Sequence, residues 1–269
     1  MASWLVVGCG YTGASLARRL VESGAQVVVT RRTAEAARQS GEALGVEARE
    51  LDLSSSSLSP SPAPVDYVVC LAPPGGDPAA EMARLLSIPC RKLVYVSSTG
   101  VYAPGGGAWV DEAWPNAPVT RSGRARVVAE AALTACPVPW VALRAAGIYG
   151  PGRGLGERIR SGTYRIVGDG TSHVSRIHVE DLVSAIILAA TTAVTGAVNA
   201  ADDDPAPIGL VADTLAAALG LPPPPRVPVA TVDPEVAGML TADRKIANRR
   251  LREELGVVLR HPSWRSALA

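Results

Sequence analysis

The chain has 269 residues, and its 26 lysines and arginines are nearly balanced by 25 aspartates and glutamates. This length supports one large α/β domain, or a nucleotide-binding domain with a small appendage, and either can bury a full core. The balance of charge provides no positive field for nucleic acid or for an anionic membrane surface, so we expect neither partner.

The sequence favours a cytoplasmic protein with reduced cysteines. The longest apolar stretch, 182–194, contains Ser184 and two threonines and is too short to span a bilayer. The first four residues lead directly into a predicted strand, without a basic segment or a cleavable apolar one. The cysteines show no C-x-x-C spacing, so we expect buried free thiols and neither disulfides nor zinc; they are Cys9, Cys70, Cys90 and Cys136.

Short β-branched runs alternate with helical patterns over the first half of the chain, which indicates βαβ units on a parallel sheet. The predicted strands are 4–7, 26–30, 46–51, 67–71, 92–96 and 140–143. The predicted helices, with apolar residues at helical intervals, are 12–22, 34–44, 78–86 and 124–134. The Ser- and Pro-rich stretch 54–64 is typical of an exposed loop. The pattern predicts an α/β fold, a Rossmann-type doubly wound parallel sheet, over residues 1–150.

After Gly150 the pattern changes, and we expect residues 151–269 to form a small C-terminal substrate-binding lobe, packed on the core as one compact unit. Its predicted elements are a glycine-rich turn at 150–154, short strands near Arg165 and Val174, and helices at 180–191, 208–219 and 243–255. The aspartates at 202–204 are interpreted as a turn followed by a helix N-cap, and not as a metal cluster.

A glycine loop follows the first predicted strand and opens the first predicted helix, as a dinucleotide-binding fingerprint requires. Gly8 permits a tight turn, Gly10 lets the backbone approach a pyrophosphate, and Gly13 lets the helix pack on the strand. Tyr11 and Thr12 lie at the helix N-terminus, whose N–H groups attract phosphate. The alternative is a tight turn without a ligand.

The second predicted strand ends in Thr30, Arg31 and Arg32, where NAD-specific sites carry an acidic residue. Two guanidinium groups suit a dianionic 2′-phosphate. We therefore expect NADP(H) as the favoured cofactor, with NAD(H) possible. The alternative is that both arginines are solvated charges that lead into a helix.

Further motifs along most of the chain resemble the extended and atypical short-chain dehydrogenase/reductase families, particularly the NAD-dependent epimerase/dehydratase group. They are the glycine loop and the segments 51–53, 96–102, 143–153 and 176–182. The resemblance implies that the Ser98 hydroxyl faces the nicotinamide. It also implies that Asp52 and Leu53 lie near the adenine, that Leu71, Ala72 and Pro73 line the cofactor groove, and that Ser97 contacts the cofactor.

The resemblance also shows a departure at the catalytic residues. Typical members use a Tyr-x-x-x-Lys pair, in which the lysine lowers the tyrosine pKa from about 10 and holds the nicotinamide ribose. Here Ser122 stands at the tyrosine position and Arg126 at the lysine position. Arginine can still bind the ribose, but a serine hydroxyl is a much poorer proton donor. Proton transfer is expected from Tyr102, from Ser122 through water, or from the substrate itself.

Substrate contacts are expected from Tyr149, Arg153, Arg176 and His178. The two arginines flank the expected substrate mouth and can hold a phosphate or a carboxylate, although pairing with nearby acids is the alternative. Packing is the alternative for Tyr149 and His178. No pair of histidines has metal-ligand spacing, so we expect no metal.

The sequence thus predicts an NAD(P)-binding oxidoreductase or epimerase-like enzyme that acts on a small carbonyl, imine or sugar-nucleotide substrate. The alternative is a catalytically silent protein that senses NADP(H) or binds it as a regulatory ligand. Either a monomer or a homodimer fits the sequence.

Overall fold

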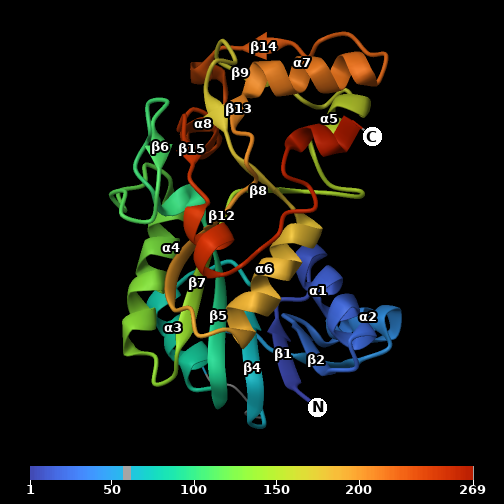
Figure 1. The fold of residues 1–269 in the computed structure, drawn as a ribbon, viewed down its shortest axis with the longest axis vertical. Helices are drawn as coiled ribbons and strands as arrows, with labels where there is room; N and C mark the ends of the chain where they lie inside the picture. Colours follow the sequence, from blue (N-terminus) through green and yellow to red (C-terminus); the bar gives the residue numbers. More distant parts are fainter. Residues whose placement is uncertain (57–61, 269) are drawn as a thin grey trace. The chain divides into compact units, whose positions relative to one another are not determined.

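The computed structural model describes residues 1–56 and 62–268 (Figure 1). The chain forms two compact units, and each of them is assembled from separate stretches of sequence. The first unit is Met1–Ser97, Ala125–Leu143 and Val183–Val198, and the second is Ser98–Arg124, Arg144–Leu182 and Asn199–Ala269. The boundary at residue 150 between a nucleotide-binding core and a C-terminal lobe stays a prediction. The predicted loop 54–64 lies partly outside the described residues.

A seven-stranded sheet has the order β12-β7-β5-β4-β1-β2-β3. Its strands are β1 (Ser3–Val7), β2 (Gln26–Arg31), β3 (Glu47–Glu50), β4 (Val65–Cys70), β5 (Cys90–Ser98), β7 (Trp140–Ala145) and β12 (Gly196–Ala200). Strand β1 pairs in parallel with both β2 and β4, so the strand order reverses beside β1. The predicted Rossmann fold is confirmed, and a crevice for a ligand is expected at this reversal. Strand β12 was not predicted.

Helices cover both faces of the sheet, and the alternation of side chains along β1 explains why. The helices are α1 (Tyr11–Glu22), α2 (Ala34–Leu44), α3 (Pro78–Leu86), α4 (Arg121–Ala132) and α6 (Val179–Thr191). The side chain of Val6 faces Gly13 of α1, whereas Leu5 and Val7 point to the opposite face. Figure 1 shows α1 and α2 on one side of the strands and α3 and α4 on the other.

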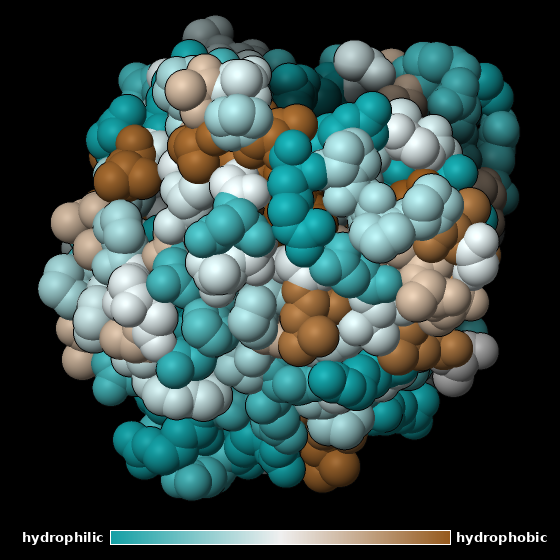
Figure 2. Space-filling view, turned by 90° about the horizontal axis from the view of Figure 1, so that it is seen from above, coloured by the Kyte–Doolittle hydropathy of each residue, from teal (hydrophilic) through white to brown (hydrophobic). Residues whose placement is uncertain are grey.

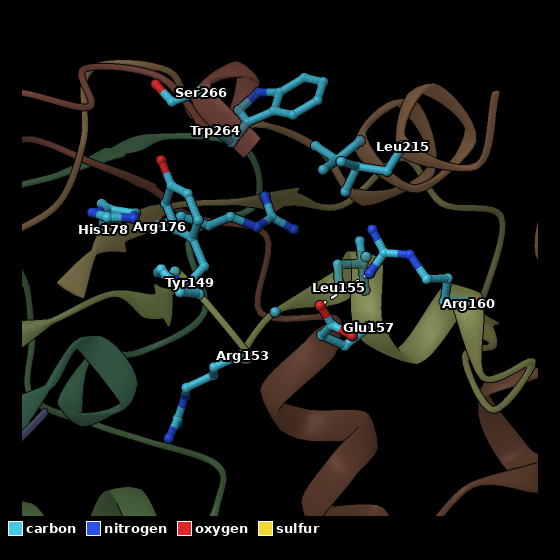
Figure 3. A pocket seen from close by; sticks show the side chains of 15 residues that line it. Tyr149, Arg153, Leu155, Glu157, Arg160, Arg176, His178, Leu215, Trp264 and Ser266 are labelled. Carbon is cyan, nitrogen blue, oxygen red and sulfur yellow. Dashed lines mark hydrogen bonds and ion pairs between the residues drawn. The ribbon is translucent and has the colours of Figure 1, made fainter. Parts of the chain in front are cut away.

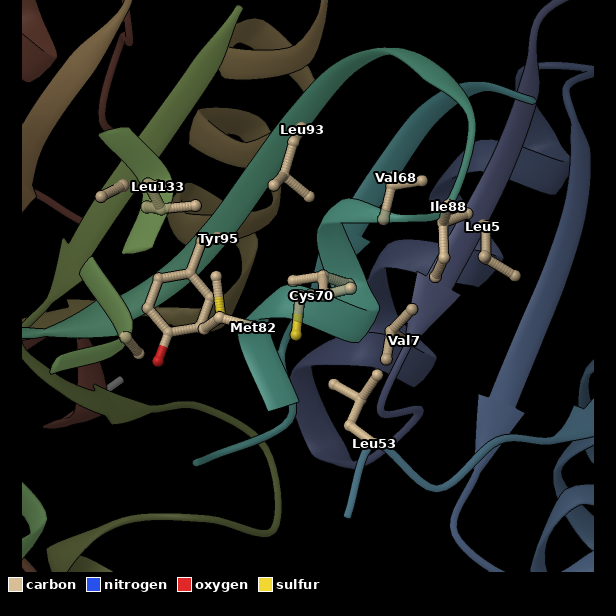
Figure 4. Packing of buried hydrophobic residues seen from close by; sticks show 13 residues of the cluster. Leu5, Val7, Leu53, Val68, Cys70, Met82, Ile88, Leu93, Tyr95 and Leu133 are labelled. Carbon is tan, nitrogen blue, oxygen red and sulfur yellow. The ribbon is translucent and has the colours of Figure 1, made fainter. Parts of the chain in front are cut away.

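The core beneath α3 and α4 is one apolar cluster (Figure 4). It contains Leu5, Val7, Val68, Cys70, Met82, Leu85, Leu93, Tyr95, Ala129 and Leu133. Each fully buried leucine or methionine contributes about 1.5–3 kcal/mol relative to an exposed position. This cluster therefore fixes the strands whose ends carry the predicted cofactor residues.

The second unit has its own core between α5 (Leu155–Arg160) and α7 (Ile208–Ala218), with Trp264 of η5 (Trp264–Leu268) fully buried in it. Small sheets support it. They pair β8 (Gly147–Tyr149) with β11 (Arg176–His178), β9 (Ile166–Val167) with β14 (Arg226–Val227), β10 (His173–Val174) with β13 (Ala206–Pro207), and β6 (Trp109–Val110) with β15 (Lys245–Ile246). A short helix, α8 (Pro234–Leu240), follows β14.

Two sequence predictions in this unit are wrong. The predicted helix 243–255 is instead β15 followed by the five-residue π-helix η4 (Arg250–Glu254). Pairing of β15 with β6 overrides the local helical pattern, and Asp243 adopts a left-handed φ of 47°. The aspartates at 202–204 do not cap a helix, because α7 begins only at Ile208, after Pro207.

The four cysteines are free, as predicted, but only Cys9 and Cys70 are buried, whereas Cys90 and Cys136 are partly exposed. Among the described residues, no helix combines the length and the apolar character that crossing a bilayer requires. Exposed large hydrophobic residues include Trp109, Met239 and Val258. Figure 2 shows hydrophobic residues interspersed with hydrophilic ones on the face drawn, which is ordinary for a protein surface.

Candidate functional site

The glycine loop is built so that only glycine fits at two of its positions. Gly8 has a φ of 90°, and a Cβ there would lie 2.8 Å from the backbone nitrogen of Ala72. A Cβ on Gly13 would lie 2.8 Å from the carbonyl oxygen of Gly8. A Cβ on Gly10 would meet no atom within 4 Å, so this position faces open space. No side chain caps α1, which leaves its first N–H groups available for a ligand.

A cavity of about 320 Å³ lies beside this loop. Its lining includes the predicted cofactor residues Gly8, Gly10, Arg31, Arg32, Asp52, Leu53, Leu71, Ala72 and Pro73, together with Gly75 and Glu81. The structure thus brings together residues from the ends of β1, β2, β3 and β4. The space fits a dinucleotide, since glycine backbone, an uncapped helix start and two guanidinium groups face one groove.

The remaining predicted cofactor residues of the first unit hold the groove together. Thr30 is buried and its hydroxyl accepts a hydrogen bond from the Gly8 N–H at 3.4 Å. Tyr11 and Thr12 form the start of α1. The Ser97 hydroxyl is buried and donates to Glu130 Oε1 at 2.5 Å.

The two arginines after β2 have different surroundings. Arg31 donates a hydrogen bond to the Cys9 carbonyl oxygen, which holds the glycine loop to β2. Arg32 is exposed. Hydrogen bonds from the Ser54 N–H and hydroxyl keep the pKa of Asp52 below its usual range, and the charge of Arg32 adds to this effect. Arg32 is therefore the guanidinium better placed to meet an incoming phosphate.

The predicted catalytic residues fall in both units. Arg126 donates to the carbonyl oxygen of Val96 at 3.4 Å, near the end of β5. The Ser98 hydroxyl oxygen accepts from the Gly100 N–H at 3.0 Å, so its own proton is available for another acceptor.

Ser122 is held by Glu235 of α8. The carboxylate accepts hydrogen bonds from the Ser122 hydroxyl, from the Ser122 N–H at 2.9 Å and from the Arg121 N–H at 2.6 Å. The bond from the Ser122 hydroxyl is the main cause that lowers the pKa of Glu235 to about 2. Glu235 thus caps the start of α4, and the Ser122 proton is engaged with a carboxylate.

Tyr102 lies in the interior of the second unit. Its exposed fraction is 0%, its hydroxyl donates to Asn199 Oδ1 at 2.6 Å, and it accepts from Arg144 at 2.9 Å. The Arg144 guanidinium also lies 4.8 Å from the centre of the ring. The Tyr102 hydroxyl is fully buried and already forms two hydrogen bonds, which does not suit a group that transfers a proton to a substrate. We therefore treat Tyr102 as a structural residue.

A second cavity, of about 350 Å³, lies wholly in the second unit (Figure 3). All four predicted substrate residues line it, namely Tyr149, Arg153, Arg176 and His178. The rest of its lining includes Leu155, Glu157, Arg160, Val211, Leu215, Trp264 and Ser266. Residues from β8, β11, α5, α7 and η5 therefore meet around one space.

Two buried donors in this cavity have no partner among the described residues. They are one terminal nitrogen of Arg176 and the indole nitrogen of Trp264. Burial lowers the pKa of Arg176, whereas burial raises the pKa of the nearby Asp202 to about 7. No carboxylate in the described part of the chain forms an ion pair with Arg176. The charges of Asp202 and Asp204 act on Arg176 only from a distance, so an anionic ligand that bonds to the guanidinium would lower the cost of its burial.

Tyr149 and His178 occupy the wall beside Arg176 (Figure 3). The Tyr149 hydroxyl donates to the Ser263 carbonyl oxygen at 3.1 Å, and burial raises its pKa above the ordinary value. His178 Nδ1 accepts from the Glu180 N–H at 3.3 Å, and burial lowers the His178 pKa. At neutral pH both side chains are therefore uncharged.

His178, Glu180 and His261 have ligand atoms within 4.8 Å of one another. The two rings are packed with centroids 3.6 Å apart. Because Nδ1 of His178 accepts a backbone hydrogen bond, a neutral ring carries its proton on Nε2 and offers no lone pair there. The arrangement is that of packed imidazoles, and the expectation of no metal stays a prediction.

Residues 4–201 match the NAD dependent epimerase/dehydratase family. The chain belongs to this family. The family is described as NAD-dependent, which agrees with the groove and with the resemblance noted in the sequence.

Relatives of this epimerase/dehydratase family member include a 3-diazoavenalumate denitrifying reductase from Streptomyces sp, 33% identical over 195 residues, which are 66% of this chain and 64% of that protein. A functionally unknown conserved protein from Silicibacter pomeroyi is 32% identical, with a TM-score of 0.82 over 100% of this chain and 97% of the other. A human epimerase family protein with NADPH is 21% identical, with a TM-score of 0.76 over 99% of this chain and 97% of the other. The last likeness shows the fold alone.

Sequence reasoning missed Trp264, Ser266 and Glu81. Trp264 and Ser266 come from the C-terminal segment, which carries no motif. Glu81 lies in an amphipathic helix, where an acidic residue is ordinarily read as part of the exposed face. A tryptophan flanked by polar residues near the end of the chain is the only signal that pointed to a buried anchor.

Proposed function

We propose that the chain is an NADP(H)-dependent reductase of a small carbonyl or imine compound that carries an anionic group. The groove in which the glycine loop meets Arg31 and Arg32 is the observation that carries the proposal. Its fit to a 2′-phosphate supports NADP(H) over NAD(H). The name of the Streptomyces relative, a reductase, supports reduction as the direction.

When bound, the nicotinamide supplies a hydride. The roles proposed for this chain's residues come from the resemblance, and their hydrogen bonds support them. Arg126 holds the nicotinamide ribose with a guanidinium that already reaches the end of β5. Ser98 orients the substrate, because its hydroxyl proton can be donated to a carbonyl oxygen or an imine nitrogen. Water supplies the proton, since the hydroxyls of Tyr102 and Ser122 are otherwise engaged.

The substrate class is suggested by the cavity of the second unit. Arg176 and the Trp264 indole offer two unpartnered donors to the oxygens of a carboxylate or a phosphate. Leu155, Val211 and Leu215 offer an apolar wall. A volume of about 350 Å³ is at the small end of ligand pockets. A small organic anion with an apolar body fits these features.

The test is a titration with NADPH and NADH, followed by NADPH oxidation with aldehydes, ketones and imines, each with and without a carboxylate, and with nucleotide sugars. We expect tighter binding of NADPH and turnover of a carboxylated carbonyl or imine. Binding of neither nucleotide contradicts the proposal. Unchanged turnover in both Ser98→Ala and Arg126→Ala contradicts the assigned roles.

A second candidate function is supported by the state of two hydroxyls. Ser122 is bonded to Glu235, and Tyr102 is buried, so no side chain at these positions is free to donate a proton. A catalytically silent protein that senses NADP(H) fits this observation. Tight NADPH binding without oxidation by any compound of the panel, together with cofactor-dependent binding of a partner, would favour it.

A further inference from the structure

Glu81 lies in α3, and its carboxylate lines the cavity beside the glycine loop. Its side chain is almost fully buried, since the residue is 6% exposed. One oxygen, Oε2, accepts a hydrogen bond from the Gly75 N–H at 2.8 Å. The other, Oε1, is buried and has no hydrogen-bond partner among the described residues.

The fold does not require the second oxygen. Asp77 caps α3 by accepting from the Ala80 N–H at 3.1 Å, and Pro78 follows at the first helical position. The hydrogen bond from the Gly75 N–H uses Glu81 Oε2 alone. An acceptor left unsatisfied in the interior costs about 1–3 kcal/mol, and more when it is charged. A buried carboxylate oxygen in a residue that lines a ligand groove therefore calls for a donor that residues 1–56 and 62–268 do not supply.

The residues that line the groove limit which group of a bound cofactor can donate a hydrogen bond to Glu81. Glu81 forms no ion pair within the described residues, and a carboxylate repels phosphate oxygens, so its partner on a dinucleotide is not the pyrophosphate. The lining of the groove also includes Arg31, Arg32 and Asp52, which lie where the resemblance places the adenosine half. Because the 2′-oxygen of NADP(H) carries the phosphate, the adenosine half has hydrogen-bond donors only at its ribose 3′-hydroxyl and its exocyclic amine.

We propose that Glu81 Oε1 accepts a hydrogen bond from a donor on the adenosine half of the nicotinamide cofactor. Glu81 is then a cofactor-positioning residue, because its carboxylate bonds to the Gly75 N–H through one oxygen and to the cofactor through the other. The inference rests on the proposed function in that it assumes the cofactor groove. It adds a residue outside every motif of the sequence.

The experiment compares Kd values for NADPH and for 2′-phospho-ADP-ribose, which lacks the nicotinamide, in the unaltered chain, Glu81→Gln and Glu81→Ala. Glu81→Gln keeps the size and an acceptor for the Gly75 N–H, but it turns an amide donor toward the ligand's donor. We expect about tenfold weaker binding of both ligands in each variant. Glu22→Gln, an exposed position on α1, is the matched control and leaves both Kd values unchanged.

A second control separates positioning from helix stability. Asp77→Ala removes the cap of α3 without touching the cavity lining, so it lowers thermal stability and leaves both Kd values unchanged. If Asp77→Ala weakens binding as much as Glu81→Ala, the effect passes through the helix and the inference is overturned. Unchanged Kd values in both Glu81 variants, or a loss for NADPH only, also overturn it.

The reduced hypoxanthine analogue of NADPH, which lacks the exocyclic amine, distinguishes the two donors. If the unaltered chain binds NADPH more tightly than the analogue and Glu81→Ala does not, the donor is the amine. If Glu81→Ala weakens the binding of both nucleotides equally, the donor is the ribose hydroxyl. Failure of the unaltered chain to bind any nicotinamide nucleotide would refute the proposed function itself. Unaltered affinity in the Glu81 variants refutes this inference alone.

Discussion

Replacing Tyr102 by phenylalanine removes one hydroxyl and leaves the ring in place. That hydroxyl donates to Asn199 at 2.6 Å and accepts from Arg144 at 2.9 Å, and both partners are buried. A neutral hydrogen bond contributes about 0.5–1.5 kcal/mol and one to a charged group about 1.5–3 kcal/mol. We therefore expect Tyr102→Phe to lower the free energy of unfolding by about 2–4 kcal/mol.

Urea denaturation measures this change, with Tyr67→Phe as the matched control. The Tyr67 hydroxyl has no hydrogen bond among the described residues, and its ring packs on Trp4 with centroids 4.5 Å apart, so the control should unfold like the unaltered chain. NADPH affinity and turnover per folded molecule should be unchanged in Tyr102→Phe. A loss of turnover with unchanged stability would refute the structural role of Tyr102 and indicate that it is a proton donor.

Three further predictions concern charge. Arg32→Ala should weaken NADPH binding about tenfold to a hundredfold and leave NADH binding unchanged in fluorescence titrations, because it removes a charged contact to the 2′-phosphate; equal losses for both nucleotides would contradict this. Arg176→Gln should raise KM about tenfold for carboxylated substrates and not for neutral ones, as steady-state kinetics would reveal. The third concerns Asp202, whose pKa burial raises from 3.8 to about 7, so the folded state binds the proton more tightly than the unfolded one. Its contribution to stability is present at low pH and declines as pH rises from 3.8 to about 7, on the order of 4 kcal/mol in total, and Asp202→Asn should remove that decline from the stability profile. Identical pH profiles in the two chains would show that Asp202 does not titrate in this range.

The cofactor-binding part of the fold could be predicted from the sequence because the residues that determine it lie close together in the chain. The β-branched strands, the glycine loop and Arg31 with Arg32 each lie within a few consecutive residues, and strand-helix alternation orders them along a parallel sheet. Gly8 and Gly13 were identified by spacing alone, and their steric roles in the structure match that reading.

The remaining features depend on contacts between distant segments. Residues 243–255 have a helical pattern, yet Lys245 and Ile246 pair with β6. Trp264 reaches its cavity from the C-terminal segment, and Glu235 reaches Ser122 from α8. No local pattern encodes such pairings, because propensity is a weak term beside tertiary packing.

The Glu235 cap also constrains what a tyrosine could do at position 122, where the resemblance leads one to expect it. A tyrosine introduced at position 122 would replace the hydroxyl that bonds to Glu235, and the negative charge of the nearby carboxylate would raise the phenol pKa when catalysis needs it lowered. Removing Glu235 first would leave the Arg121 and Ser122 N–H groups without their acceptor. Each change is unfavourable on its own, so a tyrosine at position 122 requires a substitution at Glu235 as well.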